Sequence, residues 1–180
     1  MRPWLASLFF VGIFSIHPEE LKGVWKISET KILFLSETEL ETTKGKGTRA
    51  TGKIDFGSKT SRIEIDLTDF RTPNKLQTSH MQENYLETDS FPSAIWEGQL
   101  LEWNPKERKG ILEGNLNLHG VTKSKVRIPF QGKDTKEGIE TLSEFVVDLR
   151  DHKIEIPKLL ILKLNPEIKI KATFVWQKEN

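Results

Sequence analysis

Three side chains in the middle of the chain are of types that bind metal ions or transfer protons. His80 and Glu83 lie three residues apart in a segment with helical spacing of apolar residues, and His119 lies in a predicted turn farther along. Imidazole and carboxylate groups that converge can hold a metal ion or act as acid and base. Three unclustered ligands are weak evidence, so a metal-dependent enzyme built on His80, Glu83 and His119 is the less favoured alternative.

The simpler interpretation gives these histidines structural roles: His119 hydrogen-bonds within its turn and His80 packs at the rim of the fold. His152, beside Asp151, is expected to form a solvated surface pair. The chain has no cysteine, which excludes disulfides, thiolate catalysis and cysteine metal sites. It contains no GxSxG, HExxH, P-loop or GxGxxG motif. The sequence therefore predicts no catalytic residue, no bound metal and no cofactor.

Length, composition and charge limit the classes of protein to which the chain can belong. With 180 residues, 36% hydrophobic and 29% charged, the chain suits one globular domain. There are 27 basic and 26 acidic side chains, so the formal charge is +1. A chain that nucleic acid or an anionic membrane recognises through charge usually carries a strong basic excess. No nucleic-acid partner is therefore expected.

The first eighteen residues have the pattern of a secretory signal peptide. One basic residue, Arg2, precedes an apolar run from Trp4 to Ile16, and His17 and Pro18 follow it. The run is shorter than the roughly 18 residues of a spanning helix, so no membrane span is expected in the mature chain. Cleavage after Ser15 fits only loosely. We predict a signal peptide over 1–18, one domain over 19–180 and a periplasmic or otherwise secreted protein; the alternatives are an uncleaved anchor and a buried N-terminal helix.

Alternating apolar and polar residues predict most of the remaining structure as strands. The clearest case is 112–130, where two alternating runs flank a turn at His119 to Lys123. Similar alternation occurs over 48–56, 61–68, 94–103, 139–149 and 168–176. Two short strands are expected near 24–27 and 32–35, and a loop over 37–47. Residues 154–164 fit either a short buried helix or a rim strand.

One segment has helical periodicity. Leu76, His80, Met81 and Tyr85 recur at three- and four-residue spacing, and Asn74 is well placed as the N-cap. About eight strands, mostly joined as hairpins, with one helix between the early and middle strands, predict a mainly β fold with an antiparallel sheet closed on itself. A barrel of about eight strands either fills with side chains or holds one small ligand.

Two motifs resemble those of a known family. The turn and strands around Leu116–Lys123, and a helix of the form HMxxxYLxxxxFP before an aromatic strand, at His80–Trp96, resemble the YceI-like family of exported lipid-binding proteins. The resemblance spans about Val24 to Trp176. It implies an eight-stranded antiparallel lipocalin-like barrel whose tunnel takes a polyisoprenoid or similar amphiphile, with no catalytic residues. The segment after Leu149 departs from the pattern of many members and resembles a shorter subgroup.

The resemblance, together with the apolar strand faces, predicts which residues line the tunnel. They are Ile63, Ile65, Leu67, Leu76, Met81, Tyr85, Leu86, Trp96, Leu116, Leu118, Val126, Ile128, Phe130, Phe145, Val147, Ile170 and Phe174. Tyr85, Gln77 or His80 would meet a polar headgroup. The protein would act as a carrier or reservoir for an isoprenoid or other lipid. The alternative is a filled barrel that serves as an envelope structural or stress-interaction module and exposes Leu159 to Leu162. The oligomeric state stays open.

Overall fold

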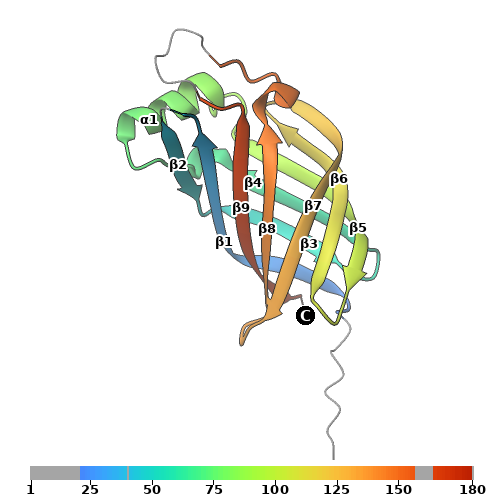
Figure 1. Ribbon diagram of the computed structural model, residues 1–180. Coiled ribbons are helices and arrows are strands. Elements are labelled where there is room, and N and C mark those ends of the chain that lie inside the picture. Colours follow the sequence, from blue (N-terminus) through green and yellow to red (C-terminus); the bar gives the residue numbers. More distant parts are fainter. Residues whose placement is uncertain (1–20, 40, 157–163, 180) are drawn as a thin grey trace, which may run out of the picture.

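In the part of the chain that the structure describes, the fold consists of nine strands and one short α-helix (Figure 1). The computed structural model describes residues 21–39, 41–156 and 164–179, so the predicted signal peptide and Leu159 to Leu162 lie outside the described residues. The elements are β1 (Val24–Glu37), β2 (Thr42–Gly47), β3 (Ala50–Asp55), β4 (Thr60–Asp66), α1 (Lys75–His80), β5 (Ser93–Asn104), β6 (Lys109–Leu118), β7 (Val121–Asp134), β8 (Ile139–Asp148) and β9 (Glu167–Lys178).

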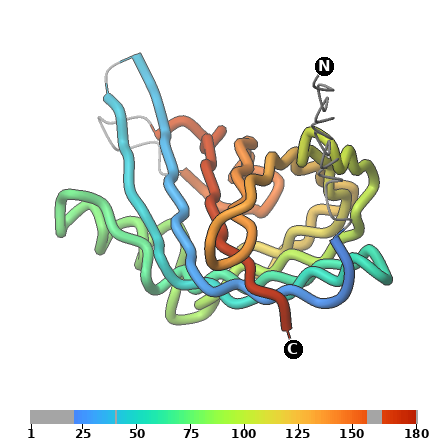
Figure 2. The backbone as a smooth tube through the Cα atoms, turned by 90° about the horizontal axis from the view of Figure 1, so that it is seen from below, coloured from blue at the N-terminus to red at the C-terminus, as the bar shows by residue number. Residues whose placement is uncertain are grey.

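The sheet closes into the predicted antiparallel barrel. Its strand order is β2-β1-β3-β4-β5-β6-β7-β8-β9, and β1 also pairs with β9, which joins the first barrel strand to the last. Eight strands, β1 and β3 to β9, thus form the ring, and β2 is an additional strand on β1. Figure 2 shows this ring from below, with the β1–β2 hairpin projecting from it. The prediction of an eight-stranded barrel with one helix is confirmed.

β1 is one long strand and not the two short strands that the sequence predicts. Its pairing with β9 runs from Trp25 to Leu35 and shifts register between Ile27 and Glu29. One extra residue at that bulge reverses the alternation. Before the bulge the odd-numbered residues such as Ile27 point inward, and after it the even-numbered residues such as Ile32 do. A period-two pattern cannot continue across such a bulge. The polar residues beside the bulge therefore separate the two apolar runs of the sequence.

β2 replaces the loop predicted over 37–47. Its outward residues are polar and its inward positions include two glycines, so no apolar alternation marks it as a strand. A Cβ atom at Gly47 would lie 2.4 Å from Cε2 of Phe70. The Phe70 ring stacks on Phe34 with 5.7 Å between ring centroids. The glycines give β2 room to cross these two rings.

The helix begins where the sequence predicts. The Asn74 side-chain oxygen accepts hydrogen bonds from the backbone N–H groups of Leu76 (2.9 Å) and Gln77 (3.3 Å), as an N-cap does. After His80 the helix continues as one wider π-turn over Met81–Tyr85, in which the Leu86 N–H donates to the Met81 carbonyl oxygen at 2.9 Å. Met81 and Tyr85 of this wider turn pack against the barrel core.

The turn between β6 and β7 is shorter than predicted. It contains only His119 (φ 53°) and Gly120 (φ 71°), the two positive φ values of a type I′ hairpin turn. The expected hydrogen bond of His119 within its own turn is not found. Its Nε2 atom instead lies 2.6 Å from Oε2 of Glu87, and its ring packs on Phe91 at 4.4 Å between centroids. His119 therefore ties the hairpin to the segment after the helix.

The expectation of a solvated His152 is wrong. Its side chain is 1% exposed, and Nδ1 lies 2.9 Å from the Val121 carbonyl oxygen. Asp151 pairs instead with Lys123. β7 pairs with β8 only from Gln131 to Asp134, so the two strands diverge toward the end of the barrel where β7 begins and β8 ends. His152 fastens the turn after β8 to the start of β7, where the two strands no longer pair.

Aromatic side chains close the end of the barrel opposite the helix. Trp25 packs edge-on against Phe56 at 6.4 Å, Phe56 lies 6.2 Å from Trp103, and Trp103 stacks on Phe130 at 5.7 Å. These rings come from strand ends far from α1 (Figure 1). The interior at that end is filled, which leaves the helix end for a cavity.

Candidate ligand-binding site

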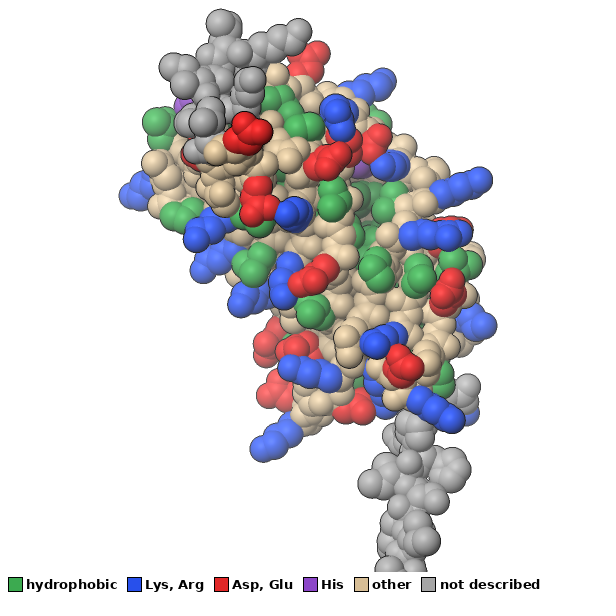
Figure 3. Space-filling view, viewed as in Figure 1, with side chains coloured by type: hydrophobic (Ala, Val, Ile, Leu, Met, Phe, Trp, Pro, Cys, Tyr) green, Lys and Arg blue, Asp and Glu red, His purple; other side chains and the backbone are tan. Residues whose placement is uncertain are grey.

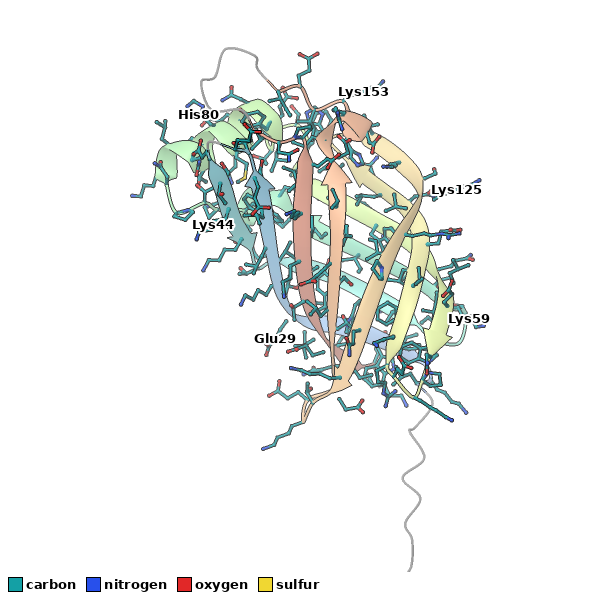
Figure 4. The ribbon with its side chains drawn as sticks, in the orientation of Figure 1. Glu29, Lys44, Lys59, His80, Lys125 and Lys153 are labelled. Carbon is teal, nitrogen blue, oxygen red and sulfur yellow. The ribbon has the colours of Figure 1, made fainter. Side chains whose placement is uncertain are left out.

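A cavity of about 470 Å³ lies at the helix end of the barrel. Leu76 (67% exposed) and His80 mark its open side, and Figure 4 shows His80 at this end of the molecule with Lys59 toward the other. The cavity is lined by Ile32, Phe34, Ser36, Thr38, Glu41, Thr43, Ile65, Leu67, Phe70, Thr72, Asn74, Leu76, Gln77, His80, Met81, Tyr85, Leu86, Ala94, Leu116, Leu118, Phe145, Val147, Leu149, Leu164, Ile168 and Ile170. Apolar side chains form most of its wall.

Strand alternation explains how the wall is built. Phe145 and Val147 on β8 face Ile170 and Ile168 on β9 in direct cross-strand pairs, and all four side chains point inward. Successive side chains of a strand point to opposite faces, so every second residue of each strand reaches the cavity. The helix and the π-turn add Met81 and other side chains from above the ring. The sequence thus places an apolar surface on several elements at once.

The cavity brings together most of the predicted tunnel residues. Those that line it are Ile65, Leu67, Leu76, Met81, Tyr85, Leu86, Leu116, Leu118, Phe145, Val147 and Ile170. The others are not in its wall; they belong to the packed interior and are Ile63, Trp96, Val126, Ile128, Phe130 and Phe174. Contact of any of these residues with a ligand stays a prediction.

Several wall residues were not predicted from the sequence. Ile32 and Phe34 belong to the apolar run of β1. Every residue of that run is apolar, so the sequence does not show that Leu33 and Leu35 face outward. Phe70 follows a short 3-10 turn and has no periodic pattern around it. The one sequence signal for the inward face of β1 is Ser36, a polar residue two positions after Phe34 that shares its inward face. Its hydroxyl accepts from the Asn165 N–H at 2.9 Å.

Polar groups ring the open side. The Gln77 amide donates to Oε1 of Glu41 and to Oγ1 of Thr43, both at 3.3 Å, which ties α1 to the β1–β2 hairpin. The Tyr85 side chain is half-buried, and this burial raises the pKa of its phenol, so the hydroxyl stays neutral at physiological pH. Tyr85 and His80 make no hydrogen bond through their side chains to other described residues. Both are therefore available to a polar group at the mouth.

The three residues of the enzyme alternative are not gathered into a site. Glu83 and His80 are exposed, and His119 is engaged with Glu87. Across 21–39, 41–156 and 164–179, no three histidine, aspartate or glutamate side chains come close enough together to hold a metal ion. The absence of enzymatic activity itself stays a prediction.

Sequence comparison assigns the family. The model of the YceI-like domain matches residues 25–176. The chain belongs to the YceI-like family. The match begins in β1 and ends in β9, so it covers every strand of the barrel. No curated protein matches the chain.

Solved structures with the same fold include other YceI-like proteins. BcnA of Burkholderia cenocepacia is 15% identical with a TM-score of 0.68, over 81% of this chain and 95% of BcnA. A polyisoprenoid-binding domain of Saccharophagus degradans, implicated in plant cell wall breakdown, is 14% identical with a TM-score of 0.69, over 86% and 98%. The YceI protein of Campylobacter jejuni is 15% identical with a TM-score of 0.57, over 100% and 99%. At these identities the likeness concerns the fold.

The helices in the described ranges of this YceI-like chain are short. Among the residues that the structure describes, none forms a helix with the length and hydropathy needed to cross a membrane.

Proposed function

We propose that this protein binds a polyisoprenoid or similar amphiphile in the cavity and acts as its carrier or reservoir. The observation that carries the proposal is the apolar cavity at the helix end, because it lies in a barrel whose other end is filled. Membership of the YceI-like family and the likeness to a polyisoprenoid-binding domain support the choice of ligand class. A completely filled structural module is less well supported because the cavity exists.

The size and lining of the cavity suit an apolar tail. Small-molecule sites usually span about 300–1,000 Å³ and are mostly apolar with a few polar groups. A cavity of about 470 Å³ would enclose a short chain or one part of a long chain. Each 100 Å² of apolar ligand surface removed from water contributes about 2.5 kcal/mol before the costs of association. Burial of the tail would therefore drive binding without a charged anchor.

The polar rim would receive the headgroup. Tyr85 offers a neutral hydroxyl, and the Gln77 amide and His80 ring lie in the same part of the wall. These groups can donate to or accept from a hydroxyl, carbonyl or phosphate oxygen. No metal and no further cofactor are needed for this role, and the protein would not be an enzyme. Its location would be the periplasm or another secreted compartment, given the signal-like residues 1–18.

A pair of neighbouring valines provides the test. Val147 lines the cavity, whereas Val146 on the same strand points outward and is 54% exposed. Tryptophan at position 147 would fill part of the cavity, and tryptophan at position 146 would extend into solvent. The measurement is titration of each variant and the wild type with a dansyl-labelled prenol, followed by fluorescence.

We expect saturable binding to the wild type and to Val146→Trp. The Val147→Trp variant should bind at least about tenfold more weakly, since a side chain would occupy the ligand's space. Circular dichroism checks that both variants fold. Equal binding by the two variants, or no saturable binding by the wild type, would overturn the proposal.

A further inference from the structure

Lysines flank leucine side chains on the outside of the barrel, next to the cavity. On β2, β1 and β9 the residues Lys44, Leu35 and Lys169 are direct cross-strand partners, and Val146 of β8 continues the row. Residues opposite each other in paired strands point to the same face. Lys44, Lys169 and Val146 are exposed, and Leu35 is half-buried between the lysines.

The next outward row repeats this arrangement. Lys46 of β2 pairs with Leu33 of β1, Leu33 pairs with Lys171 of β9, and Lys171 pairs with Glu144 of β8. We call these two rows the β2–β1–β9 face. Figure 3 shows basic side chains with hydrophobic ones between them over these strands. Lysine side chains can lie along apolar surface and keep the ammonium group in water, which suits this alternation.

The charges of the face are only partly balanced. Both lysines of β9 have carboxylate partners; Lys171 Nζ, for example, lies 2.8 Å from Glu144 Oε1. Lys44 and Lys46 of β2 form no ion pair with any residue in the described ranges. The face therefore has an excess of positive charge although the whole chain is nearly neutral. Such an excess attracts an anionic surface.

The face and the cavity share the same strands. Phe34 and Thr43 line the cavity, whereas their neighbours Leu33, Leu35 and Lys44 point outward from the same stretch of β1 and β2. The Gln77–Thr43 hydrogen bond brings the helix of the mouth to this hairpin. Leu76 on that helix is 67% exposed and apolar. A surface that contacts the face would therefore lie beside the opening of the cavity.

We propose that the β2–β1–β9 face docks on the surface of an anionic lipid bilayer, with the cavity mouth at its margin. Leucines between lysines favour a bilayer over an acidic protein, because apolar side chains can enter the headgroup region while the ammonium groups meet lipid phosphates. The docking itself requires only the face. The idea that it allows lipid to pass between bilayer and cavity rests on the proposed function.

The experiment measures binding of the full chain to phosphatidylcholine vesicles with and without phosphatidylglycerol, by flotation at low salt and at about 0.5 M NaCl. The test variant is Lys44→Gln with Lys46→Gln. The matched control is Lys106→Gln with Lys136→Gln, which removes the same charge from the turns β5–β6 and β7–β8. All chains carry the apolar N-terminal run, so differences between them report the replaced lysines.

We expect the wild type and the control to prefer the anionic vesicles and to lose that preference at high salt. The test variant should bind anionic vesicles about tenfold or more weakly. The Val147→Trp variant should dock normally, so failure of docking and failure of ligand binding can be told apart.

Equal binding by test and control variants would overturn the proposal, and would leave Lys44 and Lys46 as protection of the β2 edge against strand pairing. The proposal would also be overturned if the wild type formed a dimer and the test variant were monomeric, because the face would then join two copies.

Discussion

Phe34 occupies the space that a side chain at Gly45 would need. A Cβ atom on Gly45 would lie 2.3 Å from Cζ of Phe34 and 2.3 Å from the carbonyl oxygen of Arg71. Real Cβ atoms do not approach other heavy atoms so closely, and the Arg71 oxygen belongs to the backbone and cannot turn away. Phe34 is also part of the cavity wall. The shape of the cavity at β2 therefore depends on a glycine.

Replacement of this glycine should damage the barrel. We expect Gly45→Val to lower the free energy of unfolding by about 1–3 kcal/mol, because the added side chain must displace the Phe34 ring or separate β2 from Arg71. Urea denaturation followed by tryptophan fluorescence measures this. Lys44→Val, one residue away and outward-facing, is the control and should change stability by less than about 0.5 kcal/mol. Equal stabilities of the two variants would contradict this account of β2.

Gly45 and Gly47 show why part of the site could not be predicted from the sequence. Alternation in 139–149 and 168–176 is direct evidence of which side chains face inward, and the structure has those strands with that parity. In β2 the inward positions are glycines, so the apolar surface there is provided by Phe34 and Phe70 from other segments. No pattern within 42–47 contains that information, because it depends on tertiary packing.

Bulges and buried polar groups limit sequence interpretation in a different way. The bulge after Ile27 hides the continuity of β1, and with it the inward direction of Ile32. His152 looked solvated because its sequence neighbours are polar, yet its partner is the carbonyl oxygen of Val121, distant in sequence. Local patterns identified the strands other than β2 and divided β1 in two. Contacts between distant segments determined where the cavity begins and the packed interior ends.

A buried hydrogen bond in the packed half of the barrel gives a second prediction. Nε1 of Trp96, a side chain 3% exposed, donates to Oγ of Ser61 at 3.0 Å. Ser61→Ala leaves the indole N–H without a partner in the interior, which should cost about 1–3 kcal/mol of the free energy of unfolding. The added change Trp96→Phe removes the unsatisfied donor.

Chemical denaturation of the two single variants and the double variant tests this coupling. Ser61→Ala should cost clearly less in the Trp96→Phe background than in the wild type. If the two substitutions are simply additive, the hydrogen bond does not contribute as described.

The carboxylate of Asp69, in the 3-10 turn after β4, contacts the corner between β2 and β3 and gives a prediction for pH. Partial burial raises the pKa of Asp69, but hydrogen bonds from the Thr48 N–H and hydroxyl, with the charge and N–H of Arg49, outweigh this and hold the pKa below its usual value. The pKa in the folded state is thus lower than in the unfolded state. The ionised group stabilises the fold above the ordinary aspartate pKa of about 3.9, and this contribution is lost as the pH falls through the lowered pKa.

The variant Asp69→Asn should show this dependence. At pH 7 we expect it to unfold more readily than the wild type, because the amide keeps the size of the carboxyl group but not its charge. The difference should become smaller as the pH falls below about 4. Thermal unfolding at a series of pH values measures both melting temperatures. A constant difference at all pH values would show that the charge of Asp69 does not contribute.

The most direct test of the proposed function is native mass spectrometry of the protein purified from its own host, with solvent extraction of whatever is bound. The cavity at the helix end predicts an added mass at about one ligand per chain, identified after extraction as a prenyl or other lipid. A bare protein mass that persists after incubation with isoprenoid quinones and prenyl phosphates would contradict the carrier role. The YceI-like assignment would then describe the fold alone.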